Sequence, residues 1–203
     1  LYIVPLLGEF LRRYPAINPD WHFDNRQVDL IGQGFDAAIG GGFELPQGVV
    51  ARRLTPAHRV LVASEDYLQK HAPISHPDDL KQHDGILIRS PQTGRVRSWQ
   101  LTHRDQQHSP LTLRARMTMS DSEAACATAM QGLGIALVSM PFAVPYLQAG
   151  TLQRVLPEWF VDDGNISIYY AEHKLLPGKT RAFVDFVIEQ FAEQGLGRRF
   201  SAI

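Results

Sequence analysis

The chain has 203 residues, of which 44% are hydrophobic and 20% charged, enough apolar material for one or two globular units with a core. Lys and Arg number 20 against 21 Asp and Glu, so the basic excess that favours nucleic-acid binding is missing. No apolar run approaches the roughly 20 residues that cross a membrane. Cys126 is the only cysteine, which excludes an internal disulfide and predicts a reducing, cytoplasmic setting.

Helical and extended patterns alternate over the first 63 residues. Apolar residues recur at helical spacing up to Pro15, and the alternation of Trp21 and Phe23 with polar residues is typical of a half-buried strand. The predicted elements are a helix over 3–14, a strand over 17–24, a short helix over 27–33, a strand over 35–39, and extended chain over 49–54 and 59–63. The last two form either separate strands or one bent strand.

Strands dominate the remaining chain, and helices separate several of them. In chain order we predict helices over 65–71 and 77–81, strands over 85–90, 97–101 and 111–119, a helix over 142–148, strands over 152–156 and 166–171, and a helix over 180–194. In the strand over 111–119 the odd-numbered residues are predicted to face inward. Connections too long for hairpins favour mainly parallel sheets, and two units of about 100 residues fit the length.

The stretch from Ser120 to Pro141 combines a capped helix, a glycine break and a buried strand. Ser120 and Glu123 have the spacing of a capping box, and Gly132 fits the left-handed position after the helix. The apolar run 135–138 predicts a strand buried on both faces. A helix that begins where strands end offers N–H groups and positive dipole to an anion. Alternatively, Ser120 and Asp121 only cap a structural helix.

Other motifs give no catalytic or metal site. The eight histidines include no pair at metal-ligand spacing, and one cysteine cannot build a structural zinc site, so no metal or cofactor is expected. Cys126, flanked by alanines, is interpreted as a small buried side chain. Gly40-Gly41-Gly42 lacks the Gly-Lys-Ser/Thr ending of a phosphate loop, which leaves a close approach to a small ligand or a plain turn. No enzyme activity is predicted.

An ordered set of short motifs spans almost the whole chain and resembles the effector-binding domain of LysR-type transcriptional regulators. The motifs are FLRRYP at 10–15, FDAAIG at 35–40, ASEDYL at 63–68, PDDLKQH at 77–83, the strand with Trp99, GLGIA at 132–136, GTLQRVL at 150–156 and RAFVDF at 181–186. The resemblance implies an α/β fold of the type II periplasmic-binding-protein class, with two α/β subdomains and a ligand cleft between them. Subdomain I would hold residues 1–57 plus 173–203, and subdomain II residues 58–172.

The resemblance also implies partners. The domain would bind a small-molecule effector, pair as a homodimer and form tetramers in the full-length protein, without contacting membrane. DNA binding would belong to an N-terminal winged helix-turn-helix domain absent from this chain. The chain lacks an initiator Met and starts inside an amphipathic segment. Both features agree with an upstream part that carries the DNA-binding domain and the first strand.

Carried over position by position, the resemblance places eight residues at the effector site. These are Gly41, Gly42, Ser90, Ser120, Asp121, Ser122, Ser139 and Met140. Many family members have Arg where this chain has Gly40, so a guanidinium that could meet a carboxylate is missing there. Two other functions remain open, a transport-type periplasmic solute-binding protein and an enzyme on the same scaffold; the latter would need a catalytic set among these residues.

Overall fold

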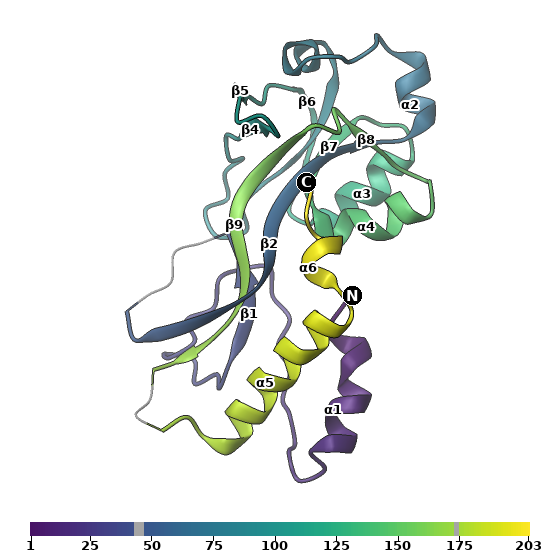
Figure 1. Ribbon diagram of the computed structural model, residues 1–203. Helices are drawn as coiled ribbons and strands as arrows, with labels where there is room; N and C mark the ends of the chain where they lie inside the picture. The colour runs from purple at the N-terminus through teal and green to yellow at the C-terminus, as the bar shows by residue number, and fades with distance from the viewer. Residues whose placement is uncertain (43–46, 173–174) are drawn as a thin grey trace. The chain divides into compact units, whose positions relative to one another are not determined.

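The computed structural model describes residues 1–42, 47–172 and 175–203, which divide into two compact units (Figure 1). Unit 1 comprises residues 1–56 and 164–199, and unit 2 comprises residues 57–163 and 200–203. The chain passes between the units inside two long strands, β2 (Val49–Ala63) and β9 (Trp159–Ala171). Compared with the predicted subdomains, residues 164–172 fall in unit 1, because the second boundary lies within β9, and Ala57 and residues 200–203 fall in unit 2.

Unit 1 begins with a short 3-10 turn, η1 (Val4–Leu6), and α1 (Leu7–Arg13), which ends before Pro15 as predicted. It also contains β1 (Ala38–Gly41), α5 (Gly178–Glu193) and α6 (Leu196–Arg199). The strand β1 pairs antiparallel with β9. Helix α1 lies beside α5, where the buried Phe10 ring contacts the rings of Phe183 and Phe186 (Figure 1).

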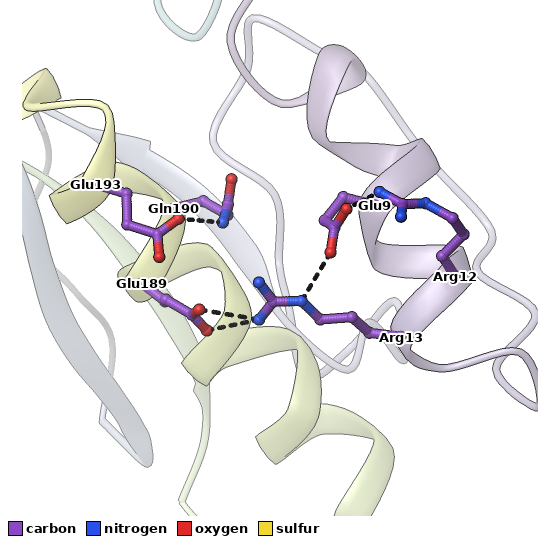
Figure 2. Close-up of polar contacts among 6 residues, drawn as sticks. All are labelled: Glu9, Arg12, Arg13, Glu189, Gln190 and Glu193. Atoms are coloured by element: carbon purple, nitrogen blue, oxygen red, sulfur yellow. Dashed lines mark hydrogen bonds and ion pairs between the residues drawn. The ribbon is translucent and has the colours of Figure 1, made fainter.

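An ion-pair chain covers the exposed side of this helix contact. Arg13 donates from Nε to Glu9 at 2.9 Å and from one terminal nitrogen to both carboxylate oxygens of Glu189, at 2.9 and 2.8 Å (Figure 2). One side chain of α1 therefore connects its own helix to α5. Exposed pairs of this kind contribute little free energy each, so the aromatic contact is the main stabilising element.

Two predicted elements of unit 1 are wrong. Residues 17–24 form no strand, since alternation alone does not supply a hydrogen-bonding partner and no described strand pairs with them. Residues 27–33 form only a turn that ends at Gly34. There the Asp29 carboxylate accepts from the Gly32 N–H at 2.9 Å, a local bond that competes with helix formation.

In the sheet of unit 2, β3 (Asp84–Ile88) runs parallel to both neighbours, the edge strand β6 (Arg114–Met119) and β7 (Ile135–Ser139). The strand β2 follows, antiparallel to β7 and to β8 (Gln153–Val155). The strands β4 (Gln100–His103) and β5 (His108–Pro110) form a hairpin, and β4 also pairs antiparallel with β9. The sheet is mixed, so the prediction of mainly parallel sheets is wrong; the short β4–β5 connection and the two long strands account for the difference.

Helices α2 (Glu65–Lys70), α3 (Ser122–Met130) and α4 (Met140–Gln148) and the 3-10 helix η2 (Pro77–Gln82) complete unit 2. The Ser64 cap of α2 is confirmed, with its Oγ accepting from the Tyr67 N–H at 3.3 Å. The predicted strand over 111–119 begins only at Arg114. Ala115, predicted to face inward, is exposed where the register with β3 shifts between Gly85 and Ile86, whereas Met117 and Met119 are half-buried as predicted.

Candidate functional site

Six of the eight predicted residues lie at or just after the ends of β3, β6 and β7. Because these strands are adjacent and parallel, their carboxyl ends meet at one edge of the sheet. Ile88 pairs with Met119 in register, and the next amide, Arg89 N–H, donates to the Met119 carbonyl at 2.6 Å. We call this set the carboxyl edge of unit 2; its predicted site residues are Ser90, Ser120, Asp121, Ser122, Ser139 and Met140.

The N-terminus of α3 lies at this edge, but its cap differs from the prediction. Asp121 is the N-cap residue, and its Oδ1 accepts from the Ala124 N–H at 2.8 Å. The capping box between Ser120 and Glu123 is therefore wrong: an aspartate one residue later both caps the helix and complements its dipole. Ser120 stands outside the helix with an exposed side chain, and Ser122 is the first helical residue.

Ser139 and Met140 form the junction between β7 and α4. Ser139 is the N-cap residue of α4 by backbone geometry, yet its side chain makes no capping hydrogen bond. Its half-buried hydroxyl is thus not committed to the helix. Met140 is only 6% exposed, so its side chain serves packing more than contact with a ligand.

Ser90 shapes the loop that follows β3. Its Oγ accepts from the Thr93 N–H at 3.3 Å, and its carbonyl accepts from the Gly94 N–H at 2.8 Å. The hydroxyl proton is still available to a ligand, since these bonds use only its acceptor oxygens.

Gly41 and Gly42 belong to unit 1. A Cβ on Gly41 would lie 2.3 Å from the Asn165 carbonyl oxygen on β9, so this glycine is needed for the β1–β9 pairing itself. Gly42 has a φ of +77°, typical of a turn. Both observations favour the plain structural interpretation of the glycine run.

Sequence reasoning missed a cationic cluster at the carboxyl edge: Arg59, Arg97, Trp99 and Asp163. Arg59 on β2 is directly opposite Ser139 in the β2–β7 pairing. Its Nε donates to Asp163 at 2.9 Å, and Arg97 donates to the other oxygen of that carboxylate at 3.1 Å. Spacing along the chain gave no signal, since 104 positions separate Arg59 from Asp163.

Unit 1 contains a separate groove of about 780 Å³. Its walls are the extended segment 17–24, the segment 33–39 with β1, and side chains of α1 and α5 such as Phe10 and Phe183. The Trp21 ring stacks on Phe23 and contacts Phe183 edge-on, while its buried Nε1 finds no acceptor among the described residues.

Other chemistry is scarce in the described part of the chain. No group of three or more His, Cys, Asp or Glu side chains there could hold a metal ion. Burial raises the pKa of the Cys126 thiol to about 12, so it is not a nucleophile near neutral pH. Within the same residues, no helix has both the length and the apolar character to span a bilayer.

Two α/β units joined by two long strands, with hydroxyl groups and helix N-termini at a sheet edge of unit 2, are typical of small-molecule-binding domains. The sequence profile of the LysR substrate binding domain family matches residues 1–192, and the chain belongs to that family. The predicted family and fold class, the type II periplasmic-binding-protein class, are confirmed.

Curated relatives and solved structures agree. An HTH-type transcriptional regulator of Xanthomonas campestris pv. campestris is 32% identical over 190 residues, 92% of this chain and 55% of the relative. The HTH-type transcriptional activator TtdR of Escherichia coli K12 is 29% identical, over 97% of this chain and 62% of the relative. The full-length Vibrio cholerae virulence activator AphB, a member of the LTTR family, is 28% identical with a TM-score of 0.77, over 92% of this chain and 63% of that one.

The regulatory domain of AphB from Vibrio vulnificus has a TM-score of 0.72 at 27% identity and is matched over 90% of its length, against 92% of this chain. The chain therefore covers a regulatory domain almost completely but spans only about three fifths of the curated relatives. These relatives are transcriptional regulators, which gives the transport-type alternative no support.

Proposed function

We propose that this chain is the effector-sensing domain of a longer LysR-type regulator and takes a small metabolite at the carboxyl edge of unit 2. One observation carries the location. Three parallel strand ends bring Ser90, Ser120 and Ser139 to one edge, where α3 and α4 also begin. Hydroxyl groups beside free helix N–H groups suit a small polar ligand.

The sensing mechanism needs binding and no bond chemistry. A ligand that favours one conformation tenfold shifts the equilibrium by about 1.4 kcal/mol. In the longer protein, that shift would pass to DNA binding and transcription through an oligomer, with homodimers of regulatory domains and tetramers of the whole chain. DNA contact would come from the N-terminal domain, and the site of action would be the cytoplasm. The family match and the transcriptional regulators among the relatives support this proposal.

The location is tested with the isolated chain. A thermal-shift screen of small metabolites identifies a stabilising compound, and calorimetry then measures its affinity for the wild type and for Ser120→Ala and Ser139→Ala. We expect the two variants to bind about tenfold more weakly, because each loses a hydrogen bond to the ligand. Ser109→Ala, on β5, is the matched control and should bind as the wild type does. Unchanged affinity in both edge variants would move the ligand elsewhere.

Sensing itself is tested in the longer protein with a transcriptional reporter. The compound found in the screen should change reporter output in the wild type and lose that effect in Ser139→Ala. Conversion of the compound into a product by the purified chain would instead support the enzyme alternative.

A further inference from the structure

The cationic cluster at the carboxyl edge has not been used so far. Arg59 and Ser139 are directly opposed on antiparallel strands, so their side chains share one face of the sheet. The next pair, Val60 and Val138, is fully buried on the opposite face. The Arg59 guanidinium therefore extends from the same face as the Ser139 hydroxyl.

Trp99 and Asp163 hold the two guanidinium groups in place. The Cζ atoms of Arg59 and Arg97 lie 4.7 and 4.3 Å from the centroid of the Trp99 ring. The Asp163 side chain is only 5% exposed and binds both cations, Arg59 at 2.9 Å and Arg97 at 3.1 Å. One carboxylate thus faces two guanidinium groups, and the cluster keeps a net positive charge. The Arg97 side chain is 55% exposed, so some of its N–H donors face solvent.

We infer that the ligand of the carboxyl edge is an organic anion whose carboxylate binds Arg97, with a polar group that reaches Ser139. This inference rests on the proposed function and names its ligand class. Planar guanidinium N–H groups match a carboxylate geometrically, and charge-assisted hydrogen bonds are stronger than neutral ones. Stacking on Trp99 orients the guanidinium before the ligand arrives, which lowers the entropy lost on binding.

The surrounding charges are consistent with this assignment. The carboxylate of Asp121 is occupied at the N-terminus of α3, where it accepts from the Ala124 N–H. The N-terminus of α4 adds positive dipole next to Ser139. Unit 2 thus supplies guanidinium groups of its own, Arg59 on β2 and Arg97 in the loop before β4.

The experiment measures quenching of tryptophan fluorescence and calorimetric binding in the isolated chain. The probes are succinate, its uncharged analogue succinamide, and inorganic phosphate at millimolar concentration. We expect succinate to bind and succinamide not to bind. Arg97→Gln should lower the affinity for succinate at least tenfold. Arg95 is an exposed neighbour in the same loop, and Arg95→Gln should leave that affinity unchanged.

Other outcomes overturn the inference. Equal binding of succinamide and succinate, or succinate affinity unchanged in Arg97→Gln, would show that Arg97 recognises no anion. Phosphate binding in place of succinate would reject the carboxylate class, and absence of binding by all three probes would reject the organic-anion site. The inference and the proposed function can fail independently. If a neutral metabolite binds through Ser139 but not Arg97, the organic-anion inference is wrong and the sensing function still holds. If a reporter in the longer protein responds to no metabolite, the proposed sensing function itself is wrong.

Discussion

At Gly134, between α3 and β7, the backbone has a φ of +151°, and an added Cβ would lie 2.7 Å from the Asp84 carbonyl oxygen. Gly134→Ala should lower the free energy of unfolding by about 2–4 kcal/mol, because strain and a clash with backbone add. Gly150 is the matched control: its φ is +69°, no atom lies within 4 Å, and the alanine should cost about 1 kcal/mol. Urea denaturation of both variants measures the two losses of unfolding free energy. Equal losses in Gly134→Ala and Gly150→Ala would show that the clash at Gly134 costs nothing.

The cap of α3 gives a second prediction at the scale of single residues. Asp121→Ala should destabilise the chain by about 1 kcal/mol, because the Ala124 N–H loses its acceptor. Asp121→Asn keeps an acceptor oxygen and should recover most of that loss. Ser120→Ala should change the free energy of unfolding by less than about 0.5 kcal/mol. The assignment of the cap would be wrong if Ser120→Ala cost as much as Asp121→Ala in the same denaturation experiment.

Caps show how far sequence reasoning extends to single residues. The Ser64 cap is confirmed because only one serine precedes that helix pattern. Before α3, three consecutive residues can cap a helix, Ser120, Asp121 and Ser122, and their residue types do not show which one does. The end of β6 at Met119 decides it, because the helix then starts at Ser122 with Asp121 as its N-cap. The Arg59–Asp163 pair was not predictable, since it depends on which strands are neighbours.

At the scale of elements, Tyr67 connects α2 to β3 through its hydroxyl, which accepts from the Asp84 N–H at 2.9 Å. The same hydroxyl lies 3.3 Å from His83 Nδ1. His83 is buried, and its Nε2 has no hydrogen-bond partner within the described residues. A proton on this ring would therefore be poorly accommodated.

This contact gives a prediction for pH. Burial, and then the nearby His71, lower the pKa of His83 from its ordinary value of 6.5. Below pH 6.5 the unfolded chain binds a proton that the folded chain does not, so the free energy of unfolding falls until the lowered pKa is reached. Above that window this histidine contributes no pH dependence.

Urea denaturation between about pH 8 and about pH 5 measures the effect. His83→Gln should flatten the dependence relative to the wild type, whereas His108→Gln, on the exposed β5, should leave it unchanged. An equally steep decline in His83→Gln would assign the dependence to other groups.

Whole elements were predictable where the local pattern and tertiary contacts agree. The glycine break and the strand β7 are examples, because an apolar run specifies burial whatever its neighbours are. The continuity of β2 was left open by the sequence, since Thr55-Pro56 interrupts the pattern between its two halves. The structure of segment 17–24 was not predictable, because a strand forms only where another strand pairs with it. Sheet direction was also not predictable, since β4 and β5 form a hairpin that their polar sequence does not indicate.

For the whole molecule, the groove in unit 1 bears on the longer protein. It lies between the extended segment 17–24 and β1, whose pairing among the described strands is with β9 alone. In the longer protein proposed above, we expect an extended segment to occupy this groove and pair with the edge of β1 that β9 does not cover. We expect amides of residues 17–24 to exchange hydrogen more slowly in the longer protein than in this chain. Equal exchange rates in the two proteins would contradict this assignment.

The lone thiol of Cys126 lies fully buried in α3, with its Sγ 3.7 Å from the Phe142 carbonyl. Because the pKa of the thiol is raised to about 12, a thiol reagent can modify it only in molecules where unit 2 has opened. The rate at which a thiol reagent alkylates Cys126 therefore measures how often unit 2 opens. Unit 1 contains no cysteine, so its own opening does not contribute to this rate.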